Sequence, residues 1–377
     1  MAGTTGPARG AVRPQRGLND ITTYVPGKPV ADVEREFGIT DIIKLASNEN
    51  PMGPSPKALE AMQTALASLN SYPDGDWFVL RRALSAALDV SPEQVFLGNG
   101  ADGVIMQTCM AYVDQDDEVI VSRTSFPVYD VYVQAMRGRL VKTPLTDDYR
   151  IDLGAMLDAI TPQTKLVFIA NPNNPTGTIV TASEVERFVR ALPDHVLAVL
   201  DEAYFDFVDS SEYPDTLRYV REGLGNVMVM RTFSKVYGLA GIRLGYGVAA
   251  PELLAPLHKI REPFAVNLAA QAAGVAALAD DDYLRRSVGA NASGREYLYR
   301  ELARLGLFYL KSHANFVLVR FGNDAGTVIH DLLAAGIIVR PCGGYELPEF
   351  ARITVGSAEQ NTRLIETLGA ILSPAAR

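Results

Sequence analysis

Cysteines, long apolar runs and clusters of basic residues are all scarce in this sequence. The 377 residues include two cysteines, Cys109 and Cys342, and neither belongs to a C-x-x-C pair. We therefore expect neither a disulfide scaffold nor a cysteine-bound metal. No apolar run approaches the roughly 20 residues of a membrane helix. The N-terminus has no apolar segment typical of a secretory signal, so a cytoplasmic location is expected.

The charge balance and the histidines exclude further classes. The formal net charge is -9 with no long basic run, which argues against nucleic acid as the main partner. The four histidines are scattered, and none pairs with a Cys, Ser or acid at the spacing of a nucleophilic site. No metal site is predicted. The apolar content of 48% and charged content of 21% are ordinary for a globular enzyme.

Strands and helices alternate steadily between about residues 78 and 250. Continuous apolar runs such as 166–170 and 196–200 suit parallel strands that are buried on both faces. The expected fold is α/β, with a large three-layer α/β/α domain around a mostly parallel sheet and a smaller α+β C-terminal domain. In the large domain, strands are predicted at 94–98, 117–121, 139–143, 165–170, 195–200, 226–231 and 244–249, and helices at 77–89, 101–113, 127–136 and 183–191.

The remaining segments define the predicted domain boundaries. Residues 1–17 are rich in Gly, Ala, Pro and Thr and are predicted to be a disordered tail. An N-terminal arm, 18–47, is expected to join the small domain. The large domain covers 48–260 and the small domain 261–377. A helix at 57–69 places Leu59, Met62, Leu66 and Leu69 on one face. Further elements are predicted at 30–37 (helix), 42–45 (strand), 252–305 (mostly helical), 315–320, 336–340 and 351–355 (strands) and 325–334 (helix).

Lys235 lies just past the apolar run 227–230, beside Ser234 and eight residues before Arg243. Desolvation in a cleft and a nearby cation both lower the pKa of a lysine, and a neutral amine can form a Schiff base with a carbonyl. Ser234 and Arg243 could hold a phosphate through charge-assisted hydrogen bonds. This combination suggests pyridoxal phosphate. A solvated Lys and Arg on a surface loop is the alternative.

The segment Gly98–Gly103 reads G-x-G-x-x-G between a predicted strand and a predicted helix. A dinucleotide site also needs an acidic residue at the end of the next strand, but that strand ends in Ser122 and Arg123. The motif is therefore interpreted as a backbone nest for a phosphate at a helix N-terminus. A purely structural turn remains the alternative.

Four more side chains follow predicted strands. Asn174 lies in an Asn- and Pro-rich loop, 171–177, which is typical of a rigid turn and could offer an amide to a ligand oxygen. Asp201 ends a buried strand and needs a cationic partner, such as a protonated pyridine nitrogen. Tyr204 could bond a phenolic oxygen. Phe126 could stack on an aromatic ring, although a core position is the simpler reading.

Arg340 and Arg352 lie in predicted strands of the small domain, and an arginine fork suits a carboxylate or a phosphate. Taken alone, each would be read as a surface ion pair. The ordered set of motifs, however, resembles the fold-type I aminotransferases that depend on pyridoxal phosphate, and in particular the histidinol-phosphate aminotransferase subfamily, from about residue 18 to the C-terminus. The motifs are Tyr24-Val-Pro-Gly-Lys-Pro, Lys44-Leu-Ala-Ser-Asn-Glu-Asn-Pro, Tyr72-Pro-Asp, Asn174-Pro-Thr-Gly, Asp201-Glu-Ala-Tyr, Arg231-Thr-Phe-Ser-Lys and Ala351-Arg-Ile-Thr-Val-Gly.

The resemblance implies a role for each of the residues around the cofactor ring. Lys235 binds pyridoxal 5′-phosphate as a Schiff base and carries the proton from the substrate Cα. Asp201 pairs with the pyridinium nitrogen. Asn174 and Tyr204 contact the ring oxygen O3′, and Phe126 stacks on the ring. Lys235, Asp201 and Tyr204 are thus the implied catalytic residues.

The implied phosphate site combines the backbone of Ala101 and Asp102 with the side chains of Ser234 and Arg243. Tyr72 is expected to reach the phosphate site of the neighbouring subunit, so that a homodimer is the functional unit. The sequence departs from the family here, since relatives often have Ser at the position of Ala101. A contact at that position must therefore come from the backbone.

The resemblance also implies the substrates. Arg352 would bind the α-carboxylate of glutamate, and Tyr24 and Arg340 would face the phosphate of the substrate or the distal carboxylate of glutamate. The implied transaminase exchanges the amino group between L-histidinol phosphate (with imidazole acetol phosphate as its keto form) and 2-oxoglutarate, in histidine biosynthesis.

Three alternatives stay open on the sequence. The first is an aromatic amino acid aminotransferase of the same group, with Phe264 and Tyr24 lining a pocket for a flat ring. The second is a binding protein that keeps the fold without turnover, although the intact Lys235 argues against it. A nicotinamide dehydrogenase is the most distant.

Overall fold

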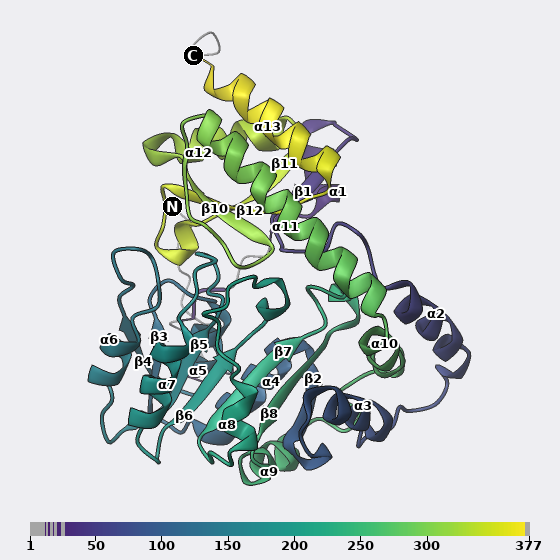
Figure 1. Ribbon diagram of the computed structural model, residues 1–377, viewed down its shortest axis with the longest axis vertical. Helices are drawn as coiled ribbons and strands as arrows, with labels where there is room; N and C mark the ends of the chain where they lie inside the picture. Colours follow the sequence, from purple (N-terminus) through teal and green to yellow (C-terminus); the bar gives the residue numbers. More distant parts are fainter. Residues whose placement is uncertain (1–11, 13, 16–17, 19–20, 24–26, 374–377) are drawn as a thin grey trace.

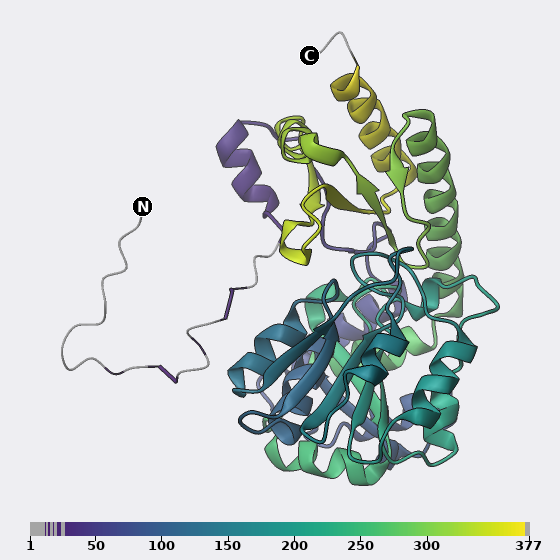
Figure 2. The same cartoon turned by 90° about the vertical axis from the view of Figure 1, so that its left-hand side faces the viewer.

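The computed structural model describes residues 12, 14–15, 18, 21–23 and 27–373. Two sheets, each with its own helices, lie one above the other, and a single long helix, α11, runs between the two halves (Figure 1). Figure 2 shows the same two halves from the side, with helices on both faces of the larger sheet. The expected α/β class is confirmed.

The larger sheet has seven strands, and in it β8 alone runs antiparallel to its neighbours. The strand order is β2 (Val95–Asn99), β8 (Leu244–Ala249), β7 (Val227–Thr232), β6 (Leu197–Asp201), β5 (Thr164–Ala170), β3 (Glu118–Ser122) and β4 (Arg139–Thr143). The apolar strands β5, β6 and β7 are buried almost throughout, because helices cover both faces. These helices are α4 (Gly100–Tyr112) and α5 (Val128–Ala135) on one face, and α6 (Leu153–Asp158), α7 (Ala182–Ala191) and α8 (Leu217–Arg221) on the other.

The smaller sheet has five strands and includes a strand from the N-terminal arm. Its order is β1 (Ile43–Leu45), β11 (Ile337–Pro341), β12 (Phe350–Thr354), β10 (Phe316–Arg320) and β9 (Phe308–Tyr309). β1 pairs with β11 in parallel, which joins residues from opposite ends of the chain. The helices of this half are α1 (Val30–Phe37), α11 (Asp281–Arg304), α12 (Ala325–Ala334) and α13 (Ala358–Leu372). The domain boundaries given above stay a prediction.

The helical region after β8 divides into three helices: α9 (Pro251–Ile260), α10 (Leu268–Leu278) and α11. α10 packs on α2 (Pro56–Ala65) and α3 (Phe78–Leu88). The predicted helix 57–69 is therefore shorter and ends in a 3-10 turn at Leu66–Ser68. Three of its apolar side chains stay uncovered: Leu59, Leu66 and Leu69 are 43%, 51% and 63% exposed. The helix instead packs through Ala58 and Met62, so the predicted face was wrong at three of its four positions.

The sheet topology brings the predicted motifs together. β5, β6 and β7 are parallel neighbours, so their carboxyl ends lie at one edge of the sheet. The segments that follow them contain Asn174, Asp201 and Lys235. Ligands of open α/β sheets bind at this edge. The smaller sheet covers the same edge from above (Figure 1).

Candidate active site

A cavity of about 260 Å³ lies at the carboxyl ends of the strands. Nine of the ten predicted cofactor-site residues line it. These are Ala101, Asp102, Phe126, Asn174, Asp201, Tyr204, Ser234, Lys235 and Arg243. These nine residues come from six separate stretches of the chain and converge on one space, as the predicted chemistry requires.

Lys235 lies three residues after β7, in a turn whose polar groups are already satisfied. The backbone N–H of Ser234 donates to Thr232 Oγ1 at 3.1 Å, and Thr232 Oγ1 donates to the carbonyl of Leu244 at 3.2 Å. Burial, and after it the nearby Arg352 guanidinium, lower the pKa of Lys235 to about 8. A larger fraction of this amine is neutral at pH 7 than for a free lysine, which makes it a better nucleophile.

Asp201 ends β6 and is buried without a cation. Its Oδ2 accepts a hydrogen bond from the Tyr129 hydroxyl at 2.5 Å, and its Oδ1 accepts one from the Ala203 N–H at 3.1 Å. Burial raises the pKa of Asp201 to about 6, while the Tyr129 hydrogen bond opposes that rise. Among the described residues, no lysine or arginine forms an ion pair with this carboxyl group. It therefore suits a ligand atom that is positively charged.

The N-terminus of α4 and Arg243 form a cradle for an anion. Gly100 has φ of 74°, and a Cβ there would lie 2.5 Å from Arg243 Nη2, so only glycine allows the guanidinium this close. Arg243 Nη2 also bonds Asp102 Oδ2 at 3.1 Å. The free N–H groups at the start of α4, the guanidinium and the Ser234 hydroxyl are the donors that a phosphate prefers.

The upper wall of the cavity is tied to the N-terminal arm. Arg352 of β12 donates to Asn174 Oδ1 and, at 2.8 Å, to the carbonyl of Ala46. Asn48 Nδ2 donates to the Tyr204 hydroxyl at 2.9 Å. Segments of the larger sheet, the smaller sheet and the N-terminal part of the chain are thus joined by the Arg352 guanidinium and the Tyr204 hydroxyl.

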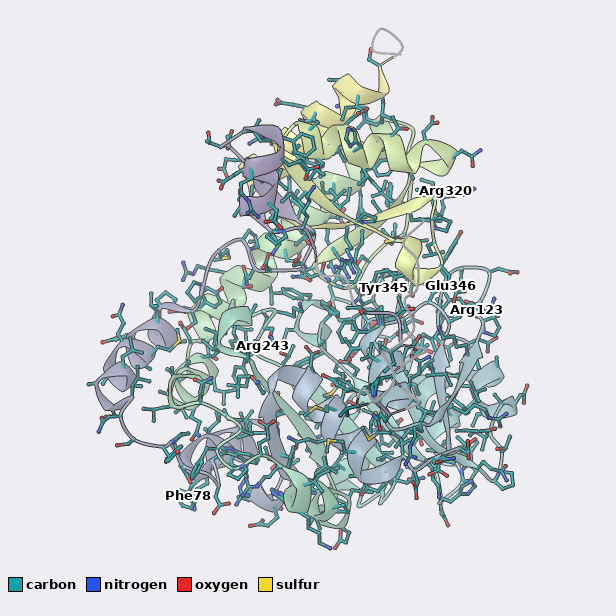
Figure 3. All side chains as sticks on the ribbon, turned by 180° about the vertical axis from the view of Figure 1, so that it is seen from behind. Phe78, Arg123, Arg243, Arg320, Tyr345 and Glu346 are labelled. Carbon is teal, nitrogen blue, oxygen red and sulfur yellow. The ribbon has the colours of Figure 1, made fainter. Side chains whose placement is uncertain are left out.

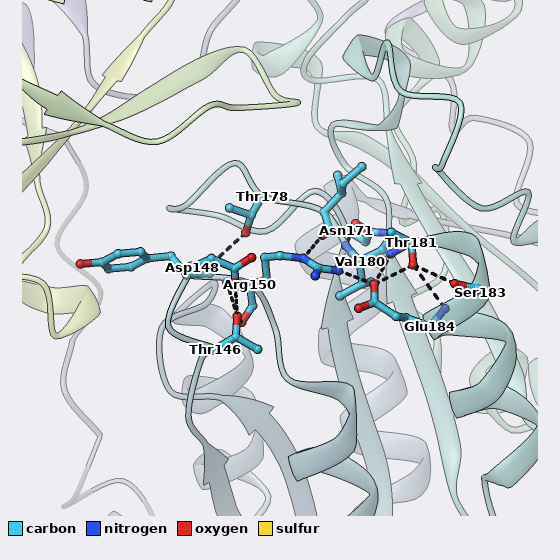
Figure 4. A network of polar contacts seen from close by, with 11 residues as sticks. Thr146, Asp148, Arg150, Asn171, Thr178, Val180, Thr181, Ser183 and Glu184 are labelled. Atoms are coloured by element: carbon cyan, nitrogen blue, oxygen red, sulfur yellow. Dashed lines mark hydrogen bonds and ion pairs between the residues drawn. The ribbon is translucent and has the colours of Figure 1, made fainter. Parts of the chain in front are cut away.

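The loop that carries Asn174 is anchored on both sides. Asn173 Nδ2 donates to the carbonyl of Thr124 at 3.0 Å. Asn171 exchanges two hydrogen bonds with the backbone of Val180, at 3.2 and 3.1 Å. Figure 4 shows how the adjoining network continues from Asn171 and Val180 to Arg150 and Glu184, which form an ion pair. The rigid turn expected from the Asn and Pro residues thus has side-chain support.

Four predicted residues do not line this cavity, and one of them is Arg352, which adjoins it through its hydrogen bond to Asn174. Arg340 lies directly opposite Arg352 in the β11–β12 pair, but it lines a neighbouring cavity of about 380 Å³. Tyr72 is 82% exposed and stacks on Phe264, with ring centroids 4.6 Å apart. Tyr24 lies outside the described residues.

An ion-pair cluster links the two halves beside the site. Glu346, which follows the short turn at Tyr345, lies 3.7 Å from Arg123 and 3.9 Å from Lys142. Figure 3 shows Glu346 and Arg123 close together where the two halves meet. Tyr345 in turn accepts a hydrogen bond from Arg352 Nη1 at 3.3 Å.

Sequence reasoning missed several residues of the site. Ser47 and Glu49 line the cavity, and Asn48 holds Tyr204. The most important omission is Tyr129, which bonds Asp201. Its one sequence signal is its place three residues after Phe126 in a predicted helix, which puts both rings on the same side.

The described residues form neither a metal-binding cluster nor a membrane-spanning helix. In the part of the chain that the structure describes, no group of three or more His, Cys, Asp or Glu side chains could hold a metal ion. No helix formed by those residues is long and apolar enough to span a bilayer.

Comparisons with known proteins agree on one family. The family model "Aminotransferase class I and II" matches residues 40–368. A histidinol-phosphate aminotransferase of Moorella thermoacetica is 46% identical over 359 residues, which cover 95% of this chain and 93% of that protein. A histidinol-phosphate aminotransferase of Carboxydothermus hydrogenoformans is 44% identical and covers 95% of this chain and 99% of that protein.

A solved structure gives the same result. The crystal structure of histidinol-phosphate aminotransferase from Sinorhizobium meliloti, in complex with pyridoxal-5′-phosphate, matches with a TM-score of 0.89 and 32% identity. The match covers 97% of this chain and 99% of that one.

Proposed function

The chain belongs to the class I and II aminotransferases, and on that premise we propose that it transfers an amino group between L-histidinol phosphate and 2-oxoglutarate. The products are imidazole acetol phosphate and glutamate, so the enzyme acts in histidine biosynthesis. The observation that carries the proposal is the convergence of a buried carboxylate, a lysine of lowered pKa and an anion cradle on one cavity, in a chain 46% identical to an enzyme of that name.

The cofactor is pyridoxal 5′-phosphate, and the site suits it at three points. Asp201 is a buried carboxyl group without an ion-pair partner among the described residues, which matches a cationic ring nitrogen. The cradle of Ala101, Asp102, Ser234 and Arg243 matches the phosphate. The Lys235 amine, whose pKa burial lowers to about 8, matches the aldehyde. When bound, the cofactor withdraws the electrons left on the substrate Cα after its proton is removed.

The residues of the chain position and protonate the substrate. Lys235 Nζ takes the proton from the substrate Cα, and its pKa of about 8 lets it accept and release a proton near neutral pH. Phe126 covers one face of the ring. Asn174 and Tyr204 donate to the ring oxygen and so fix its orientation.

Two arginines of the smaller sheet bind the substrates. Arg352 binds the α-carboxylate of glutamate, for which its present partners Asn174 and Ala46 hold the guanidinium in place. Arg340 lies beside it on β11 and, with Tyr24, takes either the phosphate ester or the distal carboxylate. One cationic pocket thereby serves both half-reactions, because each substrate has an anion at the same end.

The functional unit is a homodimer in which Tyr72 reaches the phosphate site of the partner. The support is an uncovered apolar surface on α2, the turn after it and α3, together with Tyr72, which is 82% exposed. The exposed side chains are Leu59, Leu66, Leu69, Phe78, Val79 and Phe264. A second copy that covered this surface would place Tyr72 in a neighbouring site.

Mixing two inactive variants tests the shared site. Tyr72→Ala and Lys235→Ala are each expected to be nearly inactive. In a mixed dimer, one site has the intact Lys235 of one chain and the intact Tyr72 of the other, so activity should return to about a quarter of the parent level after subunit exchange, as random pairing of two chains requires. Mixtures that stay inactive after confirmed exchange would contradict the shared site.

The arm at 18–47, the large domain at 48–260 and the small domain at 261–377 remain our proposed division of the chain. The pairing of β1 with β11 supports placing the arm with the small domain. A cytoplasmic location is proposed because Cys109 and Cys342 are both free thiols.

Substrate preference is the decisive test of the function. We expect kcat/KM for L-histidinol phosphate to exceed that for L-phenylalanine by at least about a hundredfold, or roughly 3 kcal/mol. A preference for phenylalanine would make the protein an aromatic aminotransferase. The structure gives that alternative little support, because Phe264 stacks on Tyr72 and does not line the 260 Å³ cavity of its own chain.

A further inference from the structure

Tyr129 is a buried tyrosine that contacts both Asp201 and Phe126, two of the proposed cofactor-binding residues. Its hydroxyl donates to Asp201 Oδ2 at 2.5 Å. Its ring stacks on Phe168 of β5, with centroids 4.6 Å apart and planes 9° apart. Its ring also meets Phe126 edge to face, with centroids 5.7 Å apart. Nothing in the reaction proposed above uses this residue.

We infer that Tyr129 is a positioning residue, whose hydroxyl holds the Asp201 carboxylate in its charged form and in the orientation that receives the cationic ring nitrogen of the cofactor. This inference rests on the proposed function and adds a residue to it. Its support is the two-point hydrogen bonding of the Asp201 carboxyl group and the influence of Tyr129 on the charge of that group.

The geometric line concerns the torsion of the carboxyl group. The terminal torsion of an aspartate is broad and is fixed only by its contacts. Here Oδ1 is held by the Ala203 N–H and Oδ2 by Tyr129, so the carboxylate plane is held at two points. Each oxygen keeps a second lone pair. Asp201 lines the cavity, so those lone pairs can serve the ring N–H.

The Tyr129 ring is itself immobilised. Phe168 lies in the centre of the larger sheet, between β3 and β6, and is fully buried. A tyrosine stacked on it cannot turn its hydroxyl away from Asp201 without losing that stacking. The hydroxyl is therefore preorganised rather than recruited when the cofactor binds.

The electrostatic line concerns the charge of Asp201. Burial disfavours the carboxylate, and the like charges of Asp102 and Glu202 add to that effect. The Tyr129 hydrogen bond is the largest influence in the opposite direction. The titratable groups that act on Asp201, or on which it acts, are Tyr129, Tyr204, Tyr213, Asp102 and Glu202.

Removal of the hydroxyl raises the pKa of Asp201, because the carboxylate loses its strongest stabilising hydrogen bond and becomes more basic. With the cofactor bound, the carboxylate and the ring nitrogen would share one proton, and a more basic carboxylate draws that proton away from the ring. The ring nitrogen would then be less protonated at every pH and would withdraw electrons less well.

Tyr129→Phe is a clean variant, because it keeps both ring contacts and removes only the hydroxyl. Tyr132→Phe is the matched control: Tyr132 lies one turn away on α5 and its hydroxyl forms no hydrogen bond with another described residue. The holoenzymes are loaded with cofactor labelled with ¹⁵N in the ring. The ¹⁵N chemical shift then reports directly whether the ring nitrogen is protonated, at several values of pH.

We expect the parent and Tyr132→Phe to keep the protonated signal from pH 6 to 9. Tyr129→Phe should show that signal weakened and shifted toward the unprotonated value throughout the range, with kcat lower by about tenfold and KM changed less than about twofold. A Tyr129→Phe holoenzyme that keeps the protonated signal throughout overturns the inference, even if its activity falls through weaker cofactor binding. A parent protein that does not bind the cofactor overturns the proposed function and this inference with it.

Discussion

The two sides of the cavity are built in different ways. The floor, made of Asp201, Lys235 and Arg243, comes from segments at the ends of neighbouring strands in one sheet. The roof, on the side of Arg352, comes from a second sheet whose first strand belongs to the N-terminal arm, and Arg340 of the same sheet lines the neighbouring cavity. The floor forms once the strands of the larger sheet pair in the correct register. The roof forms only when β12, the loop that contains Asn174 and the arm at Ala46 come together.

The difference implies a division of labour. In the proposed function the floor holds the cofactor, which both half-reactions use, while the roof meets the substrates, which differ. Mutations in the floor should therefore change the rate for all substrates alike. Those in the roof should change affinity, and should do so differently for different substrates.

The largest effect is expected from the floor. Lys235→Ala should lower the transamination rate at least about a thousandfold, because no other described side chain of the cavity offers a neutral amine for proton transfer. Cofactor should still bind through the cradle, measurably by equilibrium dialysis. Lys259→Ala, at an exposed position of α9, is the control. Parent-like turnover by Lys235→Ala would refute the role of the lysine.

Asp201→Asn should come next. The amide keeps the shape of the side chain but cannot hold a protonated ring nitrogen, so kcat should fall about a hundredfold or more for both amino donors. Cofactor affinity should fall by about tenfold, since the phosphate cradle is intact. If kcat and cofactor affinity fell by the same factor, Asp201 would contribute only to cofactor binding.

The roof should respond more weakly and through KM. Arg352→Lys loses the planar fork that takes a carboxylate with two hydrogen bonds, so KM for 2-oxoglutarate should rise about ten- to a hundredfold while kcat changes less. Arg320→Lys on β10, an exposed partner of Glu349, serves as the control. A pure kcat effect of Arg352→Lys would place this arginine with the floor and remove the contrast.

The smallest effect concerns the link between the two halves. Glu346→Gln removes the cross-links to Arg123 and Lys142, which are partly exposed and therefore weak. KM should change by less than about threefold, and the change should vanish at high salt. Glu349→Gln, whose arginine partner lies in the same sheet, should leave KM unchanged. A larger salt-insensitive change would mean that the roof is held mainly by this pair.

The floor was also the part that the sequence could predict. Strand ends are visible as apolar runs, and Asp201 directly follows such a run, whereas Asn174 and Lys235 lie in the loops within five residues of one. Because neighbouring parallel strands end at the same edge, the order of the motifs was enough to place them together. The resemblance to aminotransferases then supplied the family, which the comparisons confirm.

The rest depends on contacts that sequence order does not contain. Tyr129 reads as a core aromatic, and its bond to Asp201 becomes visible only once β5, β6 and α5 are packed. Arg340 and Arg352 became neighbours through an antiparallel pairing that no local pattern specifies. The helix at α6, the helix at α8 and the C-terminal helix α13 were not predicted.

The parallel pairing of β1 with β11 has a consequence for folding during synthesis on the ribosome. Ile43 pairs with Ile337, so the first strand made must wait for 294 further residues, or roughly 15 to 60 seconds of synthesis at typical elongation rates. All seven strands of the larger sheet are complete by Ala249. The nascent chain can thus finish the floor of its active site while β1, the edge strand of the smaller sheet, is still unpaired. An unpaired strand edge can pair with other chains, so β1 needs protection from aggregation until β11 has been made.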